Sequence, residues 1–463
     1  MFQKYYKSII IALGFIIFGS IILSTGGKSL FWNAISMAGL MIYLWIFEVI
    51  PIYLTALFPI ILAAPLGLLD VDGKVDSNIL AKSYGNNMIF IFLGGFMLAL
   101  ALEKWNIHLQ IARGILRIVG NTKSKIILGF LLSTGLLSMW VSNTATALML
   151  LPMALAVIKS LPSEEQNSRF SLFLLLSIAY GSSIGGIGTI VGSPPNLQMA
   201  SILSNQFNIE VDFIQWFVIG FPLCILMLGS CYLFFYIALG KERNKKIDSF
   251  SMEKEPWTKT QFKVLAVFLV FVILWSFKDL IALTGITYSD ESVAIFGTVL
   301  LFLIPVDRTK NLIEWSDTSK LPWGILLLFG GGLAMADALA KGGVIKWLSE
   351  SFVDLNNFPY YLILLILIAS AVFATEVISN LALVTILIPI IGAFANEYGH
   401  PIIQLSFAIT FGASLAFMLP IGTPPNAIAF SSGHIKFNQM AKVGFVLNII
   451  SITLIFLVSY FFL

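Results

Sequence analysis

Four short polar segments interrupt apolar stretches of this sequence. They contain most of the residues that could bind an ion or a polar substrate. Two are Ser-Asn pairs, Ser142-Asn143 and Ser379-Asn380, and two are Gly-Ser/Thr-Pro-Pro-Asn segments at 192–196 and 422–426. A proline lacks the backbone donor and disfavours helix in the residue before it, so each Pro-Pro predicts an unwound point in an apolar helix. Unwound carbonyls and hydroxyl or amide oxygens suit a cation such as Na⁺, while the N–H groups of a restarting helix suit an anion.

The four segments contain no Arg or Lys. A carboxylate bound there would be held by neutral donors, helix dipoles and nearby cations, and it could leave again because no fixed positive charge holds it. An acidic side chain within the membrane is costly and is a functional candidate by default. Glu376 therefore either braces its segment or attracts cations, and Asp337 presents a similar choice.

The composition places these segments in a membrane protein. Of the 463 residues 58% are hydrophobic and 11% are charged, and the mean hydropathy is +0.93. Soluble domains carry roughly 25% charged residues. The composition therefore predicts an all-α polytopic membrane protein and excludes a soluble enzyme, and the net charge of only +3 excludes a nucleic-acid partner. Cys224 and Cys231 share one apolar run and form neither a disulfide framework nor a metal site.

Apolar stretches of about 20 residues predict eleven transmembrane helices. They lie at 8–24, 34–50, 52–69, 87–102, 170–203, 212–239, 260–284, 291–306, 322–340, 401–431 and 441–463. Most of the Lys and Arg residues fall on one side when the N-terminus is cytoplasmic, which predicts a cytoplasmic N-terminus. An odd number of spans then puts the C-terminus outside.

Two further apolar stretches, 126–160 and 359–396, are too long for one helix and too short for two spans. A half of about 16 residues rises only ~24 Å, short of the ~30 Å hydrocarbon core. Both stretches are therefore predicted to be re-entrant hairpins with the Ser-Asn pairs at their tips. Irregular backbone at that depth is tolerated only within protein or beside a water-filled cavity.

The second half of the chain repeats the first. An offset of 237 residues carries Ser142-Asn143 onto Ser379-Asn380, and an offset of 230 carries the first Pro-Pro-Asn segment onto the second. Broken helices are predicted at 188–196 and 420–426. Each repeat holds five spans and one hairpin, and since five is odd the two repeats must be inverted. Inverted repeats with paired broken helices predict a secondary transporter whose site lies near the midplane.

The segments SMWVSNTAT, FATEVISN, GSPPN, GTPPN and FEVIP resemble those of the divalent anion:sodium symporter (DASS) family, from about residue 34 to the end. Members of that family carry di- and tricarboxylates or sulfate. The resemblance implies a homodimer in which a transport domain moves like an elevator against a scaffold domain. The scaffold would comprise 8–122 and 241–358, and the transport domain 123–240 and 359–463.

The same resemblance implies particular ligands for Na⁺ and substrate. The first cation site would comprise Ser138, Ser142, Asn143 and the backbone at Gly192, and the second Thr375, Asn380 and the backbone at Gly422. The substrate would contact Ser142, Asn143, Thr144, Ser193, Pro194, Ser379, Asn380, Leu381, Thr423 and Pro424. Leu381 stands where the symmetry with Ser142-Asn143-Thr144 would place Thr, which removes a hydroxyl donor from one end of the site; family members with an apolar residue at this position exist.

The expected function is Na⁺-coupled transport of a di- or tricarboxylate across the cytoplasmic membrane. A carboxylate exchanger without Na⁺ coupling and a sulfate transporter on the same fold remain alternatives. A channel would need a continuous polar pore, and a membrane-embedded enzyme or ATP-driven pump lacks support because the sequence holds no HExxH or Walker A motif. The expected partners are the carboxylate anion, membrane lipid and a second copy of the chain.

Overall fold

A computed structural model describes residues 2–71, 74–247, 255–351 and 358–463. The described part is mostly helical, and its one β-hairpin pairs β1 (Asp70–Val71) with β2 (Lys74–Val75). Residues 248–254 of the predicted cytoplasmic linker and 352–357 near the end of the predicted second scaffold segment lie outside the described residues.

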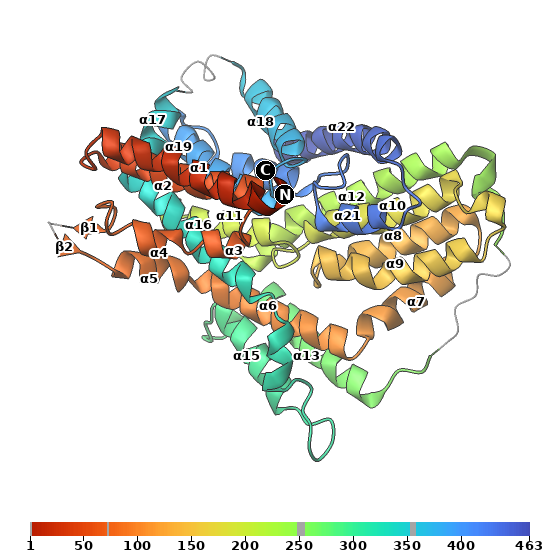
Figure 1. The fold of residues 1–463 in the computed structure, drawn as a ribbon. Helices are drawn as coiled ribbons and strands as arrows, with labels where there is room; N and C mark the ends of the chain where they lie inside the picture. The colour runs from red at the N-terminus through yellow and green to blue at the C-terminus, as the bar shows by residue number, and fades with distance from the viewer. Residues whose placement is uncertain (1, 72–73, 248–254, 352–357) are drawn as a thin grey trace.

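The helices of the two halves follow the predicted order (Figure 1). The first half holds α1 (Phe2–Ser24), α2 (Leu30–Phe47), α3 (Ile52–Thr55), α4 (Phe58–Leu62), α5 (Asn78–Tyr84), α6 (Asn87–Lys104), α7 (Ile107–Val119), α8 (Lys123–Ser138), α9 (Asn143–Lys159), α10 (Arg169–Gly186), α11 (Pro194–Phe207) and α12 (Phe213–Leu239). The second half holds α13 (Lys259–Ser276), α14 (Lys278–Ala282), α15 (Asp290–Leu303), α16 (Trp323–Lys341), α17 (Val344–Ser351), α18 (Tyr360–Ala374), α19 (Asn380–Tyr398), α20 (Ile402–Ser414), α21 (Pro424–Ser431) and α22 (Phe437–Phe462).

Eight helical segments of the described part are long and apolar enough to cross a membrane. Seven of them coincide with predicted spans, and the eighth is α19 in the second predicted hairpin. The prediction of one helix over 52–69 is wrong, because the structure has only the short helices α3 and α4 followed by turns. Pro59 lies in the first turn of α4 and Gly67 adopts a positive φ of 71°, so no continuous helix forms there.

The two helices that carry Pro-Pro are broken, as predicted. The breaks cover 187–193 between α10 and α11 and 415–423 between α20 and α21. The predicted breaks, 188–196 and 420–426, both extend too far at their C-terminal ends. The second one also begins too late. Pro194 and Pro424 open the restarting helices instead of lying in the unwound segments. The fixed φ of proline suits the first helical position, where the missing N–H would have had no partner.

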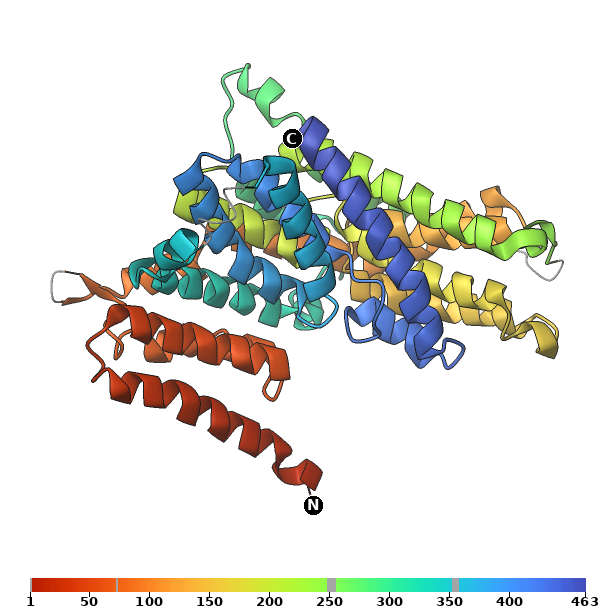
Figure 2. The same ribbon diagram turned by 90° about the horizontal axis from the view of Figure 1, so that it is seen from above.

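The helices of the predicted scaffold, the first group, contact those of the predicted transport domain, the second group, mainly where α6, α7, α16 and α17 meet α8, α11 and α19 (Figures 1 and 2). In the first group α6 crosses α15 so closely that a Cβ at Gly94 would lie 2.5 Å from the Cβ of Ala294. In the second group the yellow helices α9 and α10 pack beside the dark blue α21, and α12 packs against α22.

Candidate substrate and cation site

The first predicted hairpin breaks at 139–142, between α8 and α9. The Ser138 hydroxyl donates to the Oδ1 atom of Asn143 at 2.6 Å, so the structure brings these two predicted cation ligands together. Ser142 is the N-cap of α9, and its hydroxyl accepts a hydrogen bond from the backbone N–H of Ala145 at 3.2 Å. Such a cap satisfies one of the free donors at the start of the helix.

The second hairpin repeats this geometry at the offset of 237. The Thr375 hydroxyl lies 2.8 Å from Oδ1 of Asn380 and 2.6 Å from the carbonyl oxygen of Ala413. Ser379 precedes α19 as its N-cap residue, and its side chain makes no capping hydrogen bond. Each hairpin therefore holds a hydroxyl against the oxygen of the Asn that opens its second helix.

The break loops are also built alike, and an asparagine ties each of them. Asn196 Nδ2 donates to the carbonyl oxygens of Gly186 at 2.8 Å and Thr189 at 2.9 Å. At the offset of 230, Asn426 Nδ2 donates to the carbonyls of Ala416 and Leu419, both at 3.0 Å. The Oδ1 atoms of both asparagines are buried and have no hydrogen-bond partner among the described residues.

Asn196 and Asn426 are absent from the predicted contacts, although they end the two Pro-Pro-Asn motifs. Their recurrence at the same offset was the signal that could have identified them.

Two further donors had no such signal in the sequence. Trp216 Nε1 donates to the carbonyl of Ile187 at 2.9 Å, and the Tyr180 hydroxyl donates to the carbonyl of Phe417, the repeat partner of Ile187, at 2.8 Å.

The first hairpin tip and the first break loop meet at two glycines. A Cβ at Gly192 would lie 2.7 Å from the carbonyl oxygen of Gly186 and 3.1 Å from that of Met139. A Cβ at Gly186 would lie 2.6 Å from Oδ1 of Asn143. At both glycines a side chain would therefore collide with an oxygen of the tip or of the loop, so glycine allows the two backbones to approach closely. Unwound carbonyls and neutral side-chain oxygens are the ligands that transporters use for Na⁺.

At the second tip a carboxylate meets the break loop. Glu376 is buried, and its oxygens accept hydrogen bonds from the backbone N–H groups of Phe417 and Met418, both at 2.8 Å, and of Leu419 at 2.9 Å. Asn448 Nδ2 donates to the same carboxylate at 2.8 Å. These four donors match the bracing role of Glu376. Asp337, the other acidic candidate, accepts a hydrogen bond from the Ser83 hydroxyl at 3.0 Å.

The helices that start at the four breaks pack in pairs, α9 with α21 and α11 with α19. Beyond the C-terminal ends of α9 and α21, His434 Nδ1 lies 3.0 Å from Oδ1 of Asn167. At the far end of α11 the Phe207 ring lies against Gly392 of α19. The helices of each pair therefore run in the same direction and start together. Since Asn143 lies beside the loop before α11, the four helix N-termini and their positive dipole ends converge.

The remaining predicted contacts also lie at these helix starts. Ser193 and Thr423 are the N-cap residues of α11 and α21, and Thr144 lies half-buried in the first turn of α9. Leu381, in the first turn of α19, belongs to an apolar cluster with Trp45 of α2 and Leu328 of α16. The three side chains line a cavity of about 10 Å³ together with Ser379. Leu381 therefore contacts the predicted scaffold.

A family model described as the sodium:sulfate symporter transmembrane region matches residues 3–462. The chain belongs to this family. It is 37% identical over 458 residues to the sodium-dependent dicarboxylate transporter SdcS of Staphylococcus aureus, in strains USA300 and NCTC 8325, and the match covers 93% of this chain and 86% of SdcS. The resemblance to the divalent anion:sodium symporter family is confirmed, and with it a transporter rather than an enzyme.

A solved structure shares the fold. The Alcanivorax borkumensis YdaH transporter superposes with a TM-score of 0.58 at 12% sequence identity, over 88% of this chain and 96% of that one. At this identity the likeness concerns the fold alone. Together with the apolar helices, the family membership makes the chain a multi-pass membrane protein.

Proposed function

We propose that this transporter couples the entry of Na⁺ to the uptake of a dicarboxylate such as succinate. The observation that carries the proposal is the convergence of four helix N-termini on two oxygen-lined breaks without a basic side chain. At such a site bound cations offset the charge of the anion that the helix N-termini hold, which links the two solutes. The name of the SdcS relative, a sodium-dependent dicarboxylate transporter, supports the same pairing of solutes.

The proposed ligands are those at the four breaks. The first Na⁺ site is formed by Ser138, Ser142, Asn143 and the backbone at Gly192, and the second by Thr375, Asn380 and the backbone at Gly422. Substrate contacts come from Ser142, Asn143, Thr144, Ser193, Pro194, Ser379, Asn380, Leu381, Thr423 and Pro424. The geometry at Ser138–Asn143 and Thr375–Asn380 supports the cation sites. Because Leu381 offers no hydroxyl and packs against α2 and α16, we assign it an apolar contact at the edge of the site.

We also propose an elevator movement of 123–240 and 359–463 against a scaffold of 8–122 and 241–358. Glycines support it where the two parts touch. A Cβ at Gly95 of α6 would lie 3.5 Å from Val191, and one at Gly332 of α16 would lie 2.7 Å from Gln198 of α11. Backbone surfaces without side chains allow close helices to slide. The proposed assembly is a homodimer in the cytoplasmic membrane with the N-terminus inside and the C-terminus outside.

Uptake of labelled succinate into proteoliposomes tests the proposed function. An inward Na⁺ gradient is expected to drive accumulation at least tenfold above that in choline buffer, because the two oxygen-lined sites must be filled before the anion binds. Equal uptake in both buffers would contradict Na⁺ coupling and favour the exchanger. Na⁺-driven uptake of labelled sulfate, without uptake of labelled succinate, would favour the sulfate transporter.

Replacement of Asn196 by Ala should weaken Na⁺ binding. The substitution leaves the carbonyls of Gly186 and Thr189 without their shared donor, and two hydrogen bonds of about 0.5–1.5 kcal/mol each are lost. The Na⁺ concentration that gives half-maximal uptake is expected to rise about tenfold. Asn438→Ala, at an exposed position in the first turn of α22, is the matched control. An unchanged Na⁺ dependence in Asn196→Ala would show that the loop holds its shape without this amide.

A further inference from the structure

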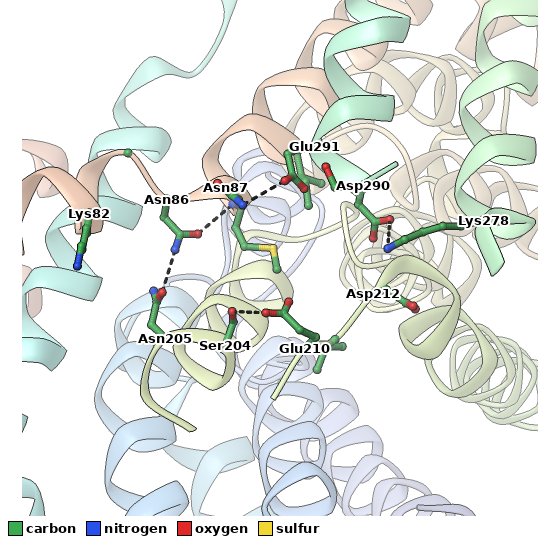
Figure 3. Close-up of a pocket in the computed structure, with 15 residues that line it drawn as sticks. Lys82, Asn86, Asn87, Ser204, Asn205, Glu210, Asp212, Lys278, Asp290 and Glu291 are labelled. Carbon is green, nitrogen blue, oxygen red and sulfur yellow. Dashed lines mark hydrogen bonds and ion pairs between the residues drawn. The ribbon is translucent and has the colours of Figure 1, made fainter. Parts of the chain in front are cut away.

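A polar pocket lies away from the proposed site, where the two parts of the chain meet (Figure 3). Its volume is about 640 Å³. The turn between α5 and α6 and the segment from Lys278 to Glu291 line one side, and the end of α11 and the start of α12 line the other. By the proposed orientation the pocket opens to the outside. Its two sides belong to the proposed scaffold and the proposed transport domain.

Asn86 connects the two sides of the pocket. Its Oδ1 atom caps α6 by accepting from the backbone N–H of Met88 at 2.9 Å, and it also accepts from the hydroxyl of Ser201 on α11 at 3.1 Å. Its Nδ2 atom donates to Oδ1 of Asn205, near the end of α11, at 3.2 Å. Two of the three bonds therefore cross from the proposed scaffold to the proposed transport domain, and Figure 3 shows the one to Asn205.

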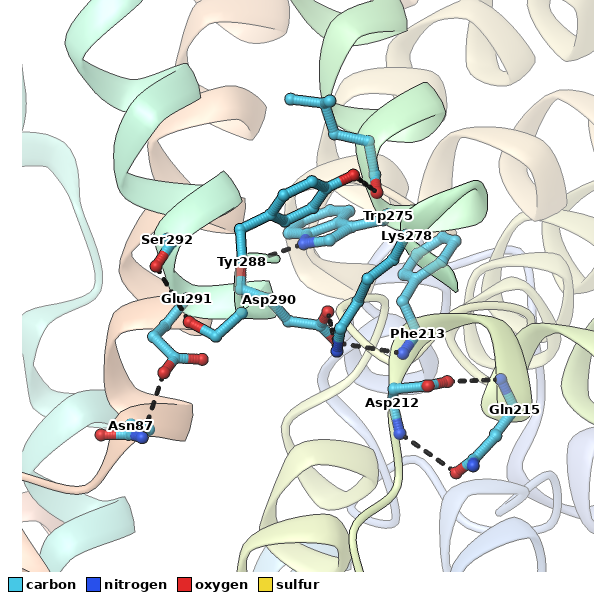
Figure 4. A network of polar contacts seen from close by, with 12 residues as sticks. Asn87, Asp212, Phe213, Gln215, Trp275, Lys278, Tyr288, Asp290, Glu291 and Ser292 are labelled. Carbon is cyan, nitrogen blue, oxygen red and sulfur yellow. Dashed lines mark hydrogen bonds and ion pairs between the residues drawn. The ribbon is translucent and has the colours of Figure 1, made fainter. Parts of the chain in front are cut away.

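Asp290 forms a second connection (Figure 4). This nearly buried carboxylate at the start of α15 lies 3.0 Å from Nζ of Lys278, which belongs to the same side of the pocket. Its other oxygen accepts from the backbone N–H of Phe213, the first residue of α12, at 3.2 Å. The N-terminus of α12 thus donates a hydrogen bond to a carboxylate of the proposed scaffold. The positive end of the helix dipole also favours a negative charge at this place.

Aromatic rings extend this second connection. The Phe213 ring stacks on Trp275 of α13 with centroids 5.1 Å apart. Trp140, at the tip of the first hairpin, meets Phe268 of the same helix edge-on at 4.8 Å. Other polar pairs of the pocket stay on one side: Asn87 donates to Glu291 within the scaffold, and Ser204 donates to Glu210 within the transport domain.

We propose that Asn86 and Asp290 are positioning residues of the transport cycle, forming a two-point latch that holds the transport domain in the present position. The proposal rests on the elevator movement proposed above. Sliding of the transport domain must break the bonds to Ser201, Asn205 and Phe213, whereas Asn87–Glu291 and Ser204–Glu210 can persist. The latch therefore sets how often the domain leaves this position.

A reversible cross-link across the latch tests the proposal. The variant Asn86→Cys/Asn205→Cys is reconstituted in proteoliposomes and oxidised, and uptake of labelled succinate under a Na⁺ gradient is compared before oxidation, after oxidation and after reduction. The native cysteines, Cys224 and Cys231, are both buried, which limits competing reactions. Uptake is expected to fall at least tenfold on oxidation and to recover on reduction, while the two single-cysteine variants do not respond.

Three outcomes are distinguishable. A cross-linked protein that retains uptake within twofold of the reduced form overturns the latch and leaves the proposed function standing. Absence of Na⁺-driven uptake in the unmodified chain refutes the proposed function and removes the movement that the latch would control. The third outcome, a reversible loss, supports the latch.

Matched single substitutions provide a second measurement. Asn205→Ala removes one amide hydrogen bond across the boundary without touching the cap of α6, and Asn87→Ala removes a comparable bond within the scaffold. Asn205→Ala is expected to change the rate of succinate counterflow about two- to tenfold. Asn87→Ala is expected to leave that rate unchanged. Equal effects of the two substitutions would contradict a latch at this boundary.

Discussion

Asn143→Ala and Asn380→Ala are each expected to lower Na⁺-driven uptake by about 100-fold or more. Each Asn opens a helix at a hairpin tip and holds its amide oxygen against a hydroxyl, Ser138 in one repeat and Thr375 in the other. A hydrogen bond to a charged group contributes about 1.5–3 kcal/mol, and every 1.4 kcal/mol is a tenfold change. Each side chain is proposed to serve both a cation and the anion, so its loss removes two such contacts.

Uptake of labelled succinate by purified, reconstituted variants provides the measurement. The control is again Asn438→Ala, which changes the same residue type at an exposed position. Protein yield and melting temperature should stay near those of the unmodified chain, because alanine is tolerated at the start of a helix. Uptake within twofold of the unmodified chain in either variant would refute the site assignment.

The second large effect is expected at Glu376. Its carboxylate accepts hydrogen bonds from three consecutive backbone N–H groups, from Phe417 to Leu419, and from Asn448. Glu376→Ala leaves four donors in the interior without an acceptor, and each unsatisfied group costs about 1–3 kcal/mol. We expect this variant to lose uptake and to melt well below the unmodified chain. Glu376→Gln keeps one acceptor oxygen and turns the other into a donor. Its uptake and its melting temperature should lie between those of Glu376→Ala and of the unmodified chain.

Thermal unfolding in detergent and succinate uptake would rank the three proteins. Met139 occupies the repeat position of Glu376 in the first hairpin, so Met139→Leu is a matched control in which no hydrogen bond of a side chain is lost. A Glu376→Ala protein with an unchanged melting temperature would contradict the bracing role. Normal stability combined with lost uptake would instead favour the attraction of cations by this carboxylate.

Much of the local structure could be predicted because its causes are local. Long apolar runs identify most spanning helices, and Pro-Pro within such a run identifies a break. Prediction failed at 52–69, where composition alone suggested a span but proline and glycine divide the segment into α3, α4 and turns. Prediction also failed for the ends of the two breaks, because it placed Pro194 and Pro424 in the unwound segments. Proline disrupts a helix interior but is favourable at the first helical position.

The sequence by itself determined that this protein lies in a membrane, that its halves repeat, and that Ser-Asn and Pro-Pro-Asn mark the breaks, since hydropathy and proline act along the chain. Only the tertiary structure decided which groups meet at these breaks. Glu376 reaches N–H groups more than 40 residues away, and Asn86 reaches Asn205 across the boundary between the two parts. Such pairings follow from the packing of distant helices against one another, and no local rule of spacing or composition specifies that packing.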